Sequence, residues 1–497
     1  MEEIQQLYGI LLSASDWDST PIAVQKLVLL LIEENRELKA RLSLIEEQLK
    51  QNSKNSSKPP SGDGFGVKQQ VKKTGGERAR GGQKGHPGHE RSFHELSEDS
   101  EIHEHIPNAC KDCGSELEGV DTQPYRHQVV DVPLITARIT EHRLHQLFCP
   151  HCGNKTRAKL PTSVSASGYG ERLSALVSWL SSDYRQSHGQ LQQLLKRLFE
   201  IDISRASINR LRQEMSQALE LIVIEAHEHV KTQSQMHSDE TSFRQGNYDG
   251  RNPKQQKGWL WVVVTRLISI FEVSLSRCQV TAKQMIGEEY GGIVISDRYS
   301  SYNWLDIEQR QVCWAHLKRD LTAMAERAGI SKEIGQALLK RQQRLFRWWH
   351  RVRDGTMSRG AFQVAVIALR QGFRNELESA VQIPIAAQEK TPLAKTVRTC
   401  EQLLKIEPAL WTFVEVSGLE PTNNVAEQAL RQAVVWRRTS FGSQSLAGSQ
   451  FVARLLSVVT SLKAQGRDIW DFLTSVCHAA RFDLEMPSLI PLNPQSP

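Results

Sequence analysis

Three acidic residues occupy positions that restrict how this chain can fold. Asp239 and Asp297 each follow a short strand-like run, and the two runs cover 235–238 and 293–296. Two further strand-like runs, GWLWVVVT and IFEVSLS, lie between them. Glu427 lies much later, in a predicted helix. The sequence therefore predicts an α/β fold in which a strand, a hairpin, a second acid-bearing strand and a distant helix bring three carboxylates together.

The predicted helix around Glu427 has a recognisable start and an apolar face. Asn423 or Asn424 is a suitable N-cap, because its side-chain oxygen can accept from a free backbone N–H of the first turn. Its predicted inner face consists of Val425, Ala429 and Val434. Together with the strands, this order of elements is that of a ribonuclease H-like core.

Cleavage of a phosphodiester by water explains why three carboxylates are wanted at one place. Two divalent ions roughly 3.5 to 4 Å apart neutralise charge on the attacking and leaving oxygens. Mg²⁺ prefers hard oxygen ligands and keeps several waters, so three acids are a sufficient protein contribution. Each acid alone is also typical of an ordinary turn or exposed helix. The joint pattern favours Asp239, Asp297 and Glu427 as catalytic ligands of Mg²⁺ or Mn²⁺.

Four motifs carry a resemblance to a known family. HSDET, ISDRYSSY, VCWAHLKRDL and TNNVAEQALR follow one another in this order, and with them the chain resembles the large, TnpC-type members of the IS66 family of bacterial insertion-sequence transposases. The resemblance implies that Asp239, Asp297 and Glu427 form a DDE triad. The family often has Asp before the paired Asn and Arg after the catalytic Glu, whereas this chain has Thr422 and Gln428.

The resemblance also implies an activity and its partners. A dimer binds the inverted ends of its element in double-stranded DNA, frees a 3′-hydroxyl by metal-dependent strand cleavage, and transfers that end into target DNA. Smaller accessory proteins of the same element are expected partners. Two other functions remain open, a zinc-binding DNA regulator without catalysis and a structure-specific nuclease of the same fold.

Three basic or titratable residues are predicted to support the acids. His316 and Arg319, in CWAHLKRDL, follow Asp297 closely enough to lie near the metal site, and the family resemblance supports this. Arg431 lies one helical turn after Glu427. It is predicted either to position a phosphate or water or to form an ordinary ion pair with Glu427.

The first hundred residues divide into a helix and a basic segment. Apolar residues at heptad spacing within 1–52, with Asn35 at an a position, predict a coiled coil and hence a homodimer; a helix packed on its own chain is the alternative. Residues 53–100 are rich in Gly, Ser, Lys and Pro and cannot form a core. They are predicted to be a flexible linker, a basic DNA-binding arm, or both. The candidate DNA-binding residues there are Lys72, Lys73, Arg78 and Arg80.

Two cysteine pairs predict a zinc-ribbon-like domain at 101–165. Each pair has two residues between its cysteines and is followed by Gly, and strand-like sequence at 125–133 and 137–148 separates the pairs. Four thiolates would fill a tetrahedral shell, so the Zn²⁺ is expected to be structural. Disulfides are the alternative, which a cytosolic chain disfavours. The four predicted ligands are Cys110, Cys113, Cys149 and Cys152.

Residues 166–230 are predicted to be helical, with helices at 172–184, 191–199 and 204–219. The last two suggest a helix-turn-helix, with Ser204 capping a recognition helix. An ordinary helical pair is an equally good interpretation. The candidate DNA-contacting residues are Arg205, Ser207, Asn209, Arg210 and Arg212.

The rest of the chain is predicted to form the core and its additions. The core begins at 231–330, a helical insertion follows at 331–415, the third acid and further helices lie at 416–480, and 481–497 is a tail. The aromatic residues of RQQRLFRWWHRVR are expected to fill a core rather than contact DNA. The charge balance of 62 basic and 56 acidic residues says little about nucleic acid. No apolar run is long enough to span a membrane, and a cytoplasmic protein, nucleoid-associated when bound to DNA, is expected.

Overall fold

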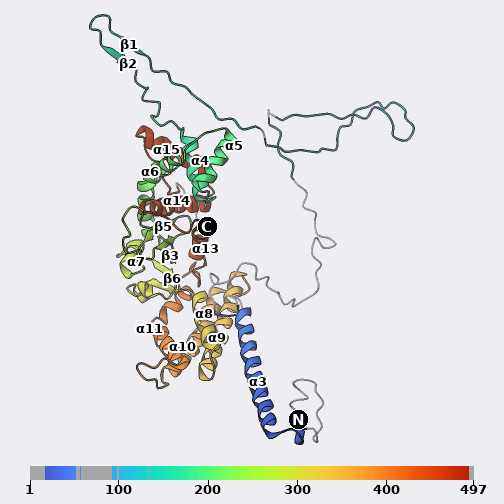
Figure 1. The fold of residues 1–497 in the computed structure, drawn as a ribbon, viewed down its shortest axis with the longest axis vertical. Coiled ribbons are helices and arrows are strands. Elements are labelled where there is room, and N and C mark those ends of the chain that lie inside the picture. Colours follow the sequence, from blue (N-terminus) through green and yellow to red (C-terminus); the bar gives the residue numbers. More distant parts are fainter. Residues whose placement is uncertain (1–16, 52–55, 58–91, 98–99, 133, 492–497) are drawn as a thin grey trace.

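The centre of the protein is a five-stranded mixed sheet with the order β5-β4-β3-β6-β7. The computed structural model describes residues 17–51, 56–57, 92–97, 100–132 and 134–491 (Figure 1). The strands are β3 (Gln235–Ser242), β4 (Trp259–Val264), β5 (Ser269–Ser274), β6 (Ile293–Ser296) and β7 (Arg310–Val312). β3, β4 and β5 are antiparallel neighbours, whereas β6 runs parallel to both β3 and β7. The α/β class predicted from the sequence is confirmed, and helices make up most of the fold.

The predicted strands agree with the observed ones apart from their ends. β6 has the predicted bounds, but β3 continues four residues past 238, so Asp239 lies inside the strand and not after it. The extension is stabilised by pairing with β4, because every residue from His237 to Ser242 has a partner there. Alternation of side chains along a strand then decides which face each acid occupies.

Helices from distant parts of the chain cover the sheet. α13 (Asn424–Ser440) packs on β3 and β4, and α14 (Leu446–Gln465) packs on β5 and on α6 (Arg205–Lys231). The buried face of α13 consists of Ala426, Ala429, Leu430, Ala433 and Trp436. The predicted inner face was therefore partly wrong. Val425 is 40% exposed, because the helix is rotated so that small alanines meet the sheet.

The helical region before the sheet is longer than predicted. α4 (Glu171–Ser182) and α5 (His188–Phe199) lie close to their predicted bounds, but α6 extends to Lys231. α6 can be this long because Ile222, Ala226 and Val230 pack into the sheet core. The side chain of Ser204 accepts a hydrogen bond from the Ser207 backbone N–H at 3.0 Å, so the predicted N-cap is confirmed. α15 (Ile469–Phe482) closes this end of the molecule against α4.

The predicted insertion is a helical body with its own aromatic core. It comprises α9 (Ile330–Arg353), α10 (Arg359–Val381), α11 (Pro392–Lys405) and α12 (Thr412–Glu415), next to α8 (Trp314–Ala325). Trp314 contacts Phe346, Phe373 and Trp411 edge to face, with ring centroids 5.2 to 6.4 Å apart. Trp349 is 6% exposed. The aromatic residues of α9 therefore fill a core, as the sequence predicts.

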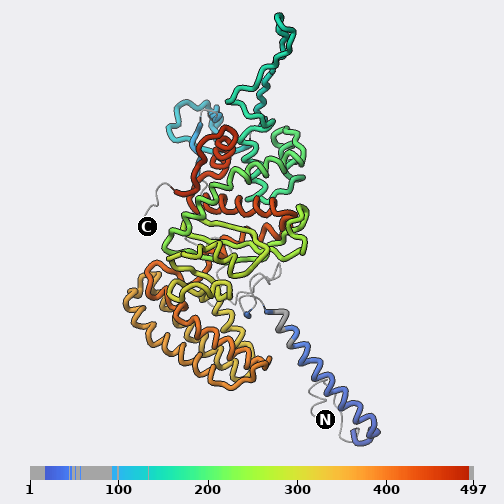
Figure 2. The backbone as a smooth tube through the Cα atoms, turned by 90° about the vertical axis from the view of Figure 1, so that its left-hand side faces the viewer, coloured from blue at the N-terminus to red at the C-terminus, as the bar shows by residue number. Residues whose placement is uncertain are grey.

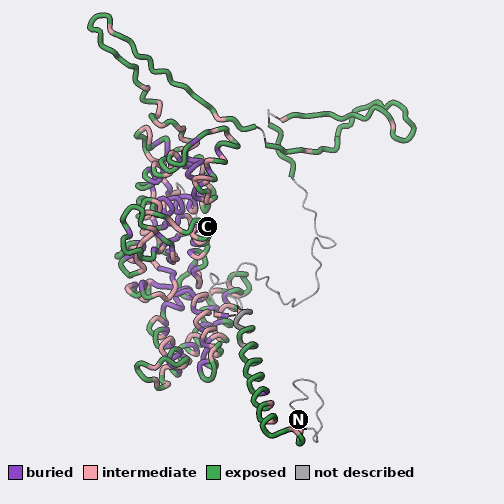
Figure 3. The backbone as a smooth tube through the Cα atoms, in the orientation of Figure 1, coloured by how far each residue is buried: buried purple, intermediate pink, exposed green. Residues whose placement is uncertain are grey.

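The N-terminal parts lie apart from this body. α3 (Ile22–Lys50) projects away as a single long helix (Figure 2). Leu31, Leu38, Leu42 and Ile45, four of its predicted heptad residues, are each more than half exposed. Almost all described residues between 92 and 160 are also exposed (Figure 3). None of the helices in the described ranges is long and apolar enough to cross a membrane.

Candidate active site

The sheet register sets Asp239 beside Asp297. β3 and β6 are parallel, and Gln235 pairs with Ile293, Met236 with Val294 and His237 with Ile295. Continuing this register by two residues brings the two acids opposite each other. The two acids therefore meet because the strands are parallel and in register, with Asp239 inside β3 at the level where the shorter β6 ends.

A buried amide connects the helix that carries Glu427 to the strand that carries Asp239. The Asn423 side chain donates to the Ser238 carbonyl oxygen at 2.8 Å and lies 2.9 Å from His237 Nδ1. Asn423 occupies the N-cap position of α13, but its side chain makes no capping hydrogen bond. The Asn423 side chain bonds to strand β3 instead. Glu427, in the first turn of α13, is thereby held over the same face of β3 as Asp239.

Replacing Asn423 with Ala should lower the free energy of unfolding by about 2 kcal/mol, because the buried Ser238 carbonyl then loses its partner. Urea unfolding measures this loss. Asn424→Ala is the matched control, because Asn424 is the exposed neighbour, and it should change stability by less than about 0.5 kcal/mol. Equal losses for both variants would contradict the assigned connection.

Glu427 faces the side chains that begin α8. Its Oε1 lies 3.4 Å from His316 Nδ1 and 3.3 Å from Arg319 Nη2. Cys313 joins this group, and ligand atoms of Cys313, His316 and Glu427 lie within 4.8 Å of one another. The three acids do not form so tight a group among the described residues. His316 and Arg319 thus lie beside the third acid, where the sequence predicted supporting residues.

The carboxylates repel one another. Burial raises the pKa of Asp239 well above its ordinary 3.8, and the nearby charges of Glu240, Asp297 and Glu427 raise it further. Burial and Arg319 lower the pKa of the His316 imidazole. The site therefore holds Asp239 where its negative charge is disfavoured by burial and by three neighbouring carboxylates.

Asp239→Asn should stabilise the metal-free protein, and more so at high pH. The folded state holds the Asp239 proton more tightly than the unfolded chain, so the wild type loses stability as the pH rises above about 4. Asn carries no charge at any pH. Each unit of pKa difference is worth about 1.4 kcal/mol. Urea unfolding in chelator at about pH 5.5 and about pH 8 tests this, and an advantage of Asn that does not grow with pH would contradict it.

Glu240, which the sequence analysis missed, forms a buried network behind the acids. Its carboxylate accepts from Tyr302 Oη at 2.7 Å and pairs with Arg277 Nη2 at 2.7 Å. Tyr302 Oη also lies 3.2 Å from Ser238 Oγ. Burial and the charge of Asp297 raise the pKa of Glu240. The available signal was its position directly after Asp239 in a strand, which turns its side chain toward the opposite, closed face.

Arg310 is a second residue that the sequence did not reveal. Its side chain is buried and donates to the Asp297 carbonyl oxygen at 3.0 Å and to Asn303 Oδ1 at 3.1 Å. Burial lowers its pKa to about 10, opposed by Asp297. It fixes the backbone at the end of β6, next to the Asp297 side chain.

The other predicted site residues have varied positions. Arg205, Asn209 and Arg210 are exposed on α6, and Ser207 is half-buried. Arg212 instead points inward, over the Phe451 ring at 4.1 Å and against His188, and burial lowers its pKa to about 10. Arg212 is therefore less accessible to DNA than the three exposed residues, and its DNA contact stays a prediction.

Arg431 was predicted to support the acids, and four basic residues of the N-terminal segment to contact DNA. Arg431 is exposed, and the ion pair found for Glu427 in the described chain is with Arg319, while the His316 ring nitrogen lies 3.4 Å away. The ordinary ion pair between Glu427 and Arg431 is therefore not formed. Lys72, Lys73, Arg78 and Arg80 lie outside the described residues.

The two cysteine pairs each form a knuckle, but they do not meet. In the first, the Ser115 carbonyl oxygen accepts from the Cys110 N–H at 2.8 Å; in the second, the Asn154 carbonyl oxygen accepts from the Cys149 N–H at 2.9 Å. No three of the four thiols lie within 4.8 Å of one another, all four being among the described residues. Within the described part of the predicted strand-like sequence, only β1 (Gln146–Phe148) is a strand, and it pairs with β2 (Lys155–Arg157). Zinc binding stays a prediction.

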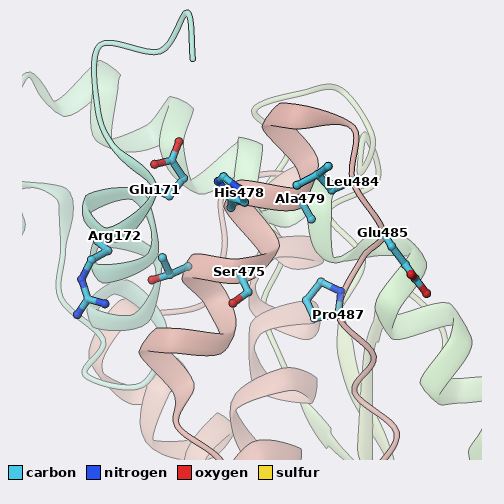
Figure 4. Close-up of a pocket in the computed structure, with 9 residues that line it drawn as sticks. Glu171, Arg172, Ser475, His478, Ala479, Leu484, Glu485 and Pro487 are labelled. Carbon is cyan, nitrogen blue, oxygen red and sulfur yellow. The ribbon is translucent and has the colours of Figure 1, made fainter. Parts of the chain in front are cut away.

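A hollow of about 430 Å³ between α4 and α15 is not part of this site. Glu171, Arg172, His478 and Glu485 line it, so its charges are mixed (Figure 4). None of the three acids borders it. The carboxylates of Glu171 and Glu485 would repel a phosphodiester there, and the three catalytic candidates are too far away to line the hollow.

Comparison with known proteins gives the chain a family. The family described as "Transposase IS66 family" matches residues 167–451, which include all three acids and their supporting helix. A family of unknown function, DUF6444, matches residues 11–92. A protein of Sinorhizobium fredii named "Uncharacterized protein y4qI" is 21% identical over 300 residues, which are 55% of this chain and 53% of that protein. The match thus spans about half the length of this relative.

Proposed function

Because the chain belongs to the IS66 transposase family, we propose that it is a DDE transposase that cleaves a DNA strand at the ends of its element and joins the freed 3′-hydroxyl to target DNA. Asp239, Asp297 and Glu427 are its catalytic acids. The observation that carries the proposal is the pair of acids on adjacent parallel strands, with a third on the helix that Asn423 fastens to the same strand.

The sheet supports a ribonuclease H-like core. Three antiparallel strands are followed by two parallel ones, in the order β5-β4-β3-β6-β7. The insertion α9 to α12 separates the last strand from the acid-bearing helix α13. This is the order of strands and acids that the sequence predicts for such a core.

The donor set of the three acids fits divalent cations. One oxygen of each carboxylate accepts a hydrogen bond, from the Glu240 N–H for Asp239, the Tyr299 N–H for Asp297, and Arg319 for Glu427. The second oxygen of each has no hydrogen-bond partner among the described residues. Free hard oxygens from several carboxylates are the ligands that Mg²⁺ or Mn²⁺ prefers. When bound, the ions would supply positive charge for the attacking and leaving oxygens.

The protein groups around the acids orient them. Arg319 holds the Glu427 side chain by an ion pair, beside which the His316 ring lies, and Arg319 adds a positive charge that can face a DNA phosphate. Tyr302 and Arg277 fix the Glu240 carboxylate on the closed face, which keeps β3 rigid below Asp239. In this scheme the nucleophile is water and then a DNA hydroxyl, so no protein side chain is bonded to DNA.

A cleavage and joining assay on the element's terminal DNA tests the proposal. The full chain should cut one strand only with Mg²⁺ or Mn²⁺, and should join a pre-cut end to a second duplex. A protein that cuts without joining would be a structure-specific nuclease. One that binds the ends but remains inert with either metal, accessory proteins included, would be a DNA-binding regulator.

The N-terminal parts belong to the same proposal. The exposed heptad residues of α3 fit a coiled-coil dimer of two chains. We propose that Zn²⁺ joins the two cysteine knuckles into a ribbon and gives the exposed segment the core that it lacks. Purified protein should then hold about one Zn²⁺ per chain. Cys113→Ser should lower the zinc content measured by mass spectrometry of the metal, whereas Cys278→Ser, which removes another exposed thiol, should not.

A further inference from the structure

A basic groove adjoins the candidate active site at the far end of β3 and α13. It has a volume of about 820 Å³. Arg244, Lys257, Arg437, Arg438 and Phe441 line it, and the other lining residues are glycine or carry hydroxyl or amide groups. No carboxylate of the described residues is among those that line it. We propose that this groove binds a single-stranded segment of the DNA that the acids act on, an inference that rests on the proposed function.

The groove is continuous with the acids through one strand and one helix. Arg437 donates to Thr241 Oγ1 at 2.8 Å, and Thr241 lies two residues after Asp239 on the same face of β3. Ser242, three residues or about 10 Å from Asp239, is part of the wall. Along α13, Arg437 lies ten residues or about 15 Å beyond Glu427. A strand leaving the acids along β3 would therefore enter the groove after a few nucleotides.

The walls of the groove are built by specific contacts. The loop after β3 pairs with the segment after α13, where the Gly246 N–H donates to the Ser443 carbonyl at 2.8 Å and the Ser443 N–H donates to the Arg244 carbonyl at 2.9 Å. Gly442 has a φ of 102°, and a Cβ there would overlap the Arg244 carbonyl oxygen. Close backbone approach thus fixes the distance between the two walls.

Two of the cationic residues that line the groove are open to solvent. Arg244 and Lys257 are exposed, and neither forms an ion pair with a described residue. The Lys257 ammonium lies over the Trp259 ring at 4.6 Å from its centroid, which restricts where it can reach. Exposed basic side chains without a carboxylate partner among the described residues are suited to binding phosphates.

The exposed ring of Phe441 indicates that the groove also contacts a nucleobase and not only the phosphates of the DNA. It is 79% exposed and has a φ of 59°, a left-handed conformation that bulky residues rarely adopt. An apolar ring held in water by a strained backbone is unfavourable for stability. Such outliers occur at functional sites. An unpaired base can stack on this ring, whereas the bases of an intact duplex are already stacked.

Binding of a fluorescein-labelled single-stranded oligonucleotide, measured by anisotropy in chelator, tests the groove without any catalysis. Phe441→Ala should weaken binding about tenfold without changing its salt dependence. Arg244→Ala with Lys257→Ala should reduce the slope of log K against log salt by about 1.4. Phe441→Ala should leave binding of the blunt duplex of the same sequence unchanged.

The same loop offers matched controls. Tyr248 is exposed but does not line the groove, and Arg251 and Lys254 are exposed bases nearby. Tyr248→Ala, and Arg251→Ala with Lys254→Ala, should retain wild-type binding. Equal losses in groove and control variants, or none in either, would overturn the inference. If the wild type joins DNA with metal but the groove variants bind the oligonucleotide normally, the groove inference fails and the proposed function stands. If the groove variants lose binding but the wild type never joins DNA, the proposed function fails and the groove inference stands.

Discussion

Asp297→Asn should abolish metal-dependent cleavage and joining, with a rate loss of at least about a thousandfold. The change keeps the shape of the side chain, and its oxygen can still accept from the Tyr299 N–H, as Asp297 does at 2.9 Å. It removes the negative charge that would hold a cation beside Asp239. Rates on a pre-cut terminal DNA, compared at equal DNA occupancy, measure the loss.

Two controls separate catalysis from folding. Asp306→Asn makes the same chemical change at an exposed position outside the acid cluster and should leave the rate unchanged. Mg²⁺ should raise the unfolding midpoint of the wild type and raise it much less in Asp297→Asn, because ligand binding stabilises the folded state. An Asn variant that joins DNA at near wild-type rates would remove Asp297 from the proposed triad.

The elements around the acids were predictable because their signals are local. Alternating and apolar runs mark β3, β4, β5 and β6 within a few residues each. Once β3 and β6 are parallel neighbours, the adjacency of Asp239 and Asp297 follows from their register. The helix of Glu427 was predictable for the same reason, although its rotation was not. The alanines that face the sheet carry a weaker apolar signal than Val425.

What the sequence did not reveal depends on contacts between distant positions. Arg277 and Tyr302 lie 37 and 62 residues from Glu240. Asn423 lies 185 residues from Ser238, and as a residue before a helix it is first interpreted as a cap. From the sequence, Arg212 is interpreted as a surface residue of a recognition helix. In the fold its guanidinium packs over the ring of Phe451, which lies far along the chain. In each case a polar residue that is typical of the surface makes a buried contact, and the sequence alone does not show which of the two environments it occupies.

The domain boundaries drawn from the sequence stay predictions, and the helical body shows why such boundaries are hard to draw. α8 belongs by position to the first part of the core, yet Trp314 packs in the aromatic cluster of the insertion. Its neighbour His316 faces Glu427. One helix thus joins the insertion to the candidate active site, and a change in the insertion core can reach the third acid through α8.

Arg277→Met should lower the free energy of unfolding by about 3 kcal/mol, the largest stability effect expected around the site. The Glu240 side chain has no exposed surface and Arg277 is 31% exposed. Met keeps much of the packing between Trp259 and Tyr299, where the guanidinium now lies 4.5 and 3.7 Å from the ring centroids. It leaves the Glu240 charge buried without a partner beside Asp239 and Asp297, which is the costly part of the change.

A double-mutant cycle with Glu240→Gln tests whether the lost stability comes from the unpaired Glu240 charge. Glu240→Gln alone should cost about 1 kcal/mol, because its amide can still accept from Tyr302. Added to Arg277→Met, it removes the stranded charge, so the double variant should be more stable than Arg277→Met by urea unfolding in chelator. Lys196→Met, in an exposed ion pair with Asp202, should cost less than about 1 kcal/mol. A double variant less stable than Arg277→Met would show that Arg277 acts through packing, and that the acids do not depend on it for charge balance.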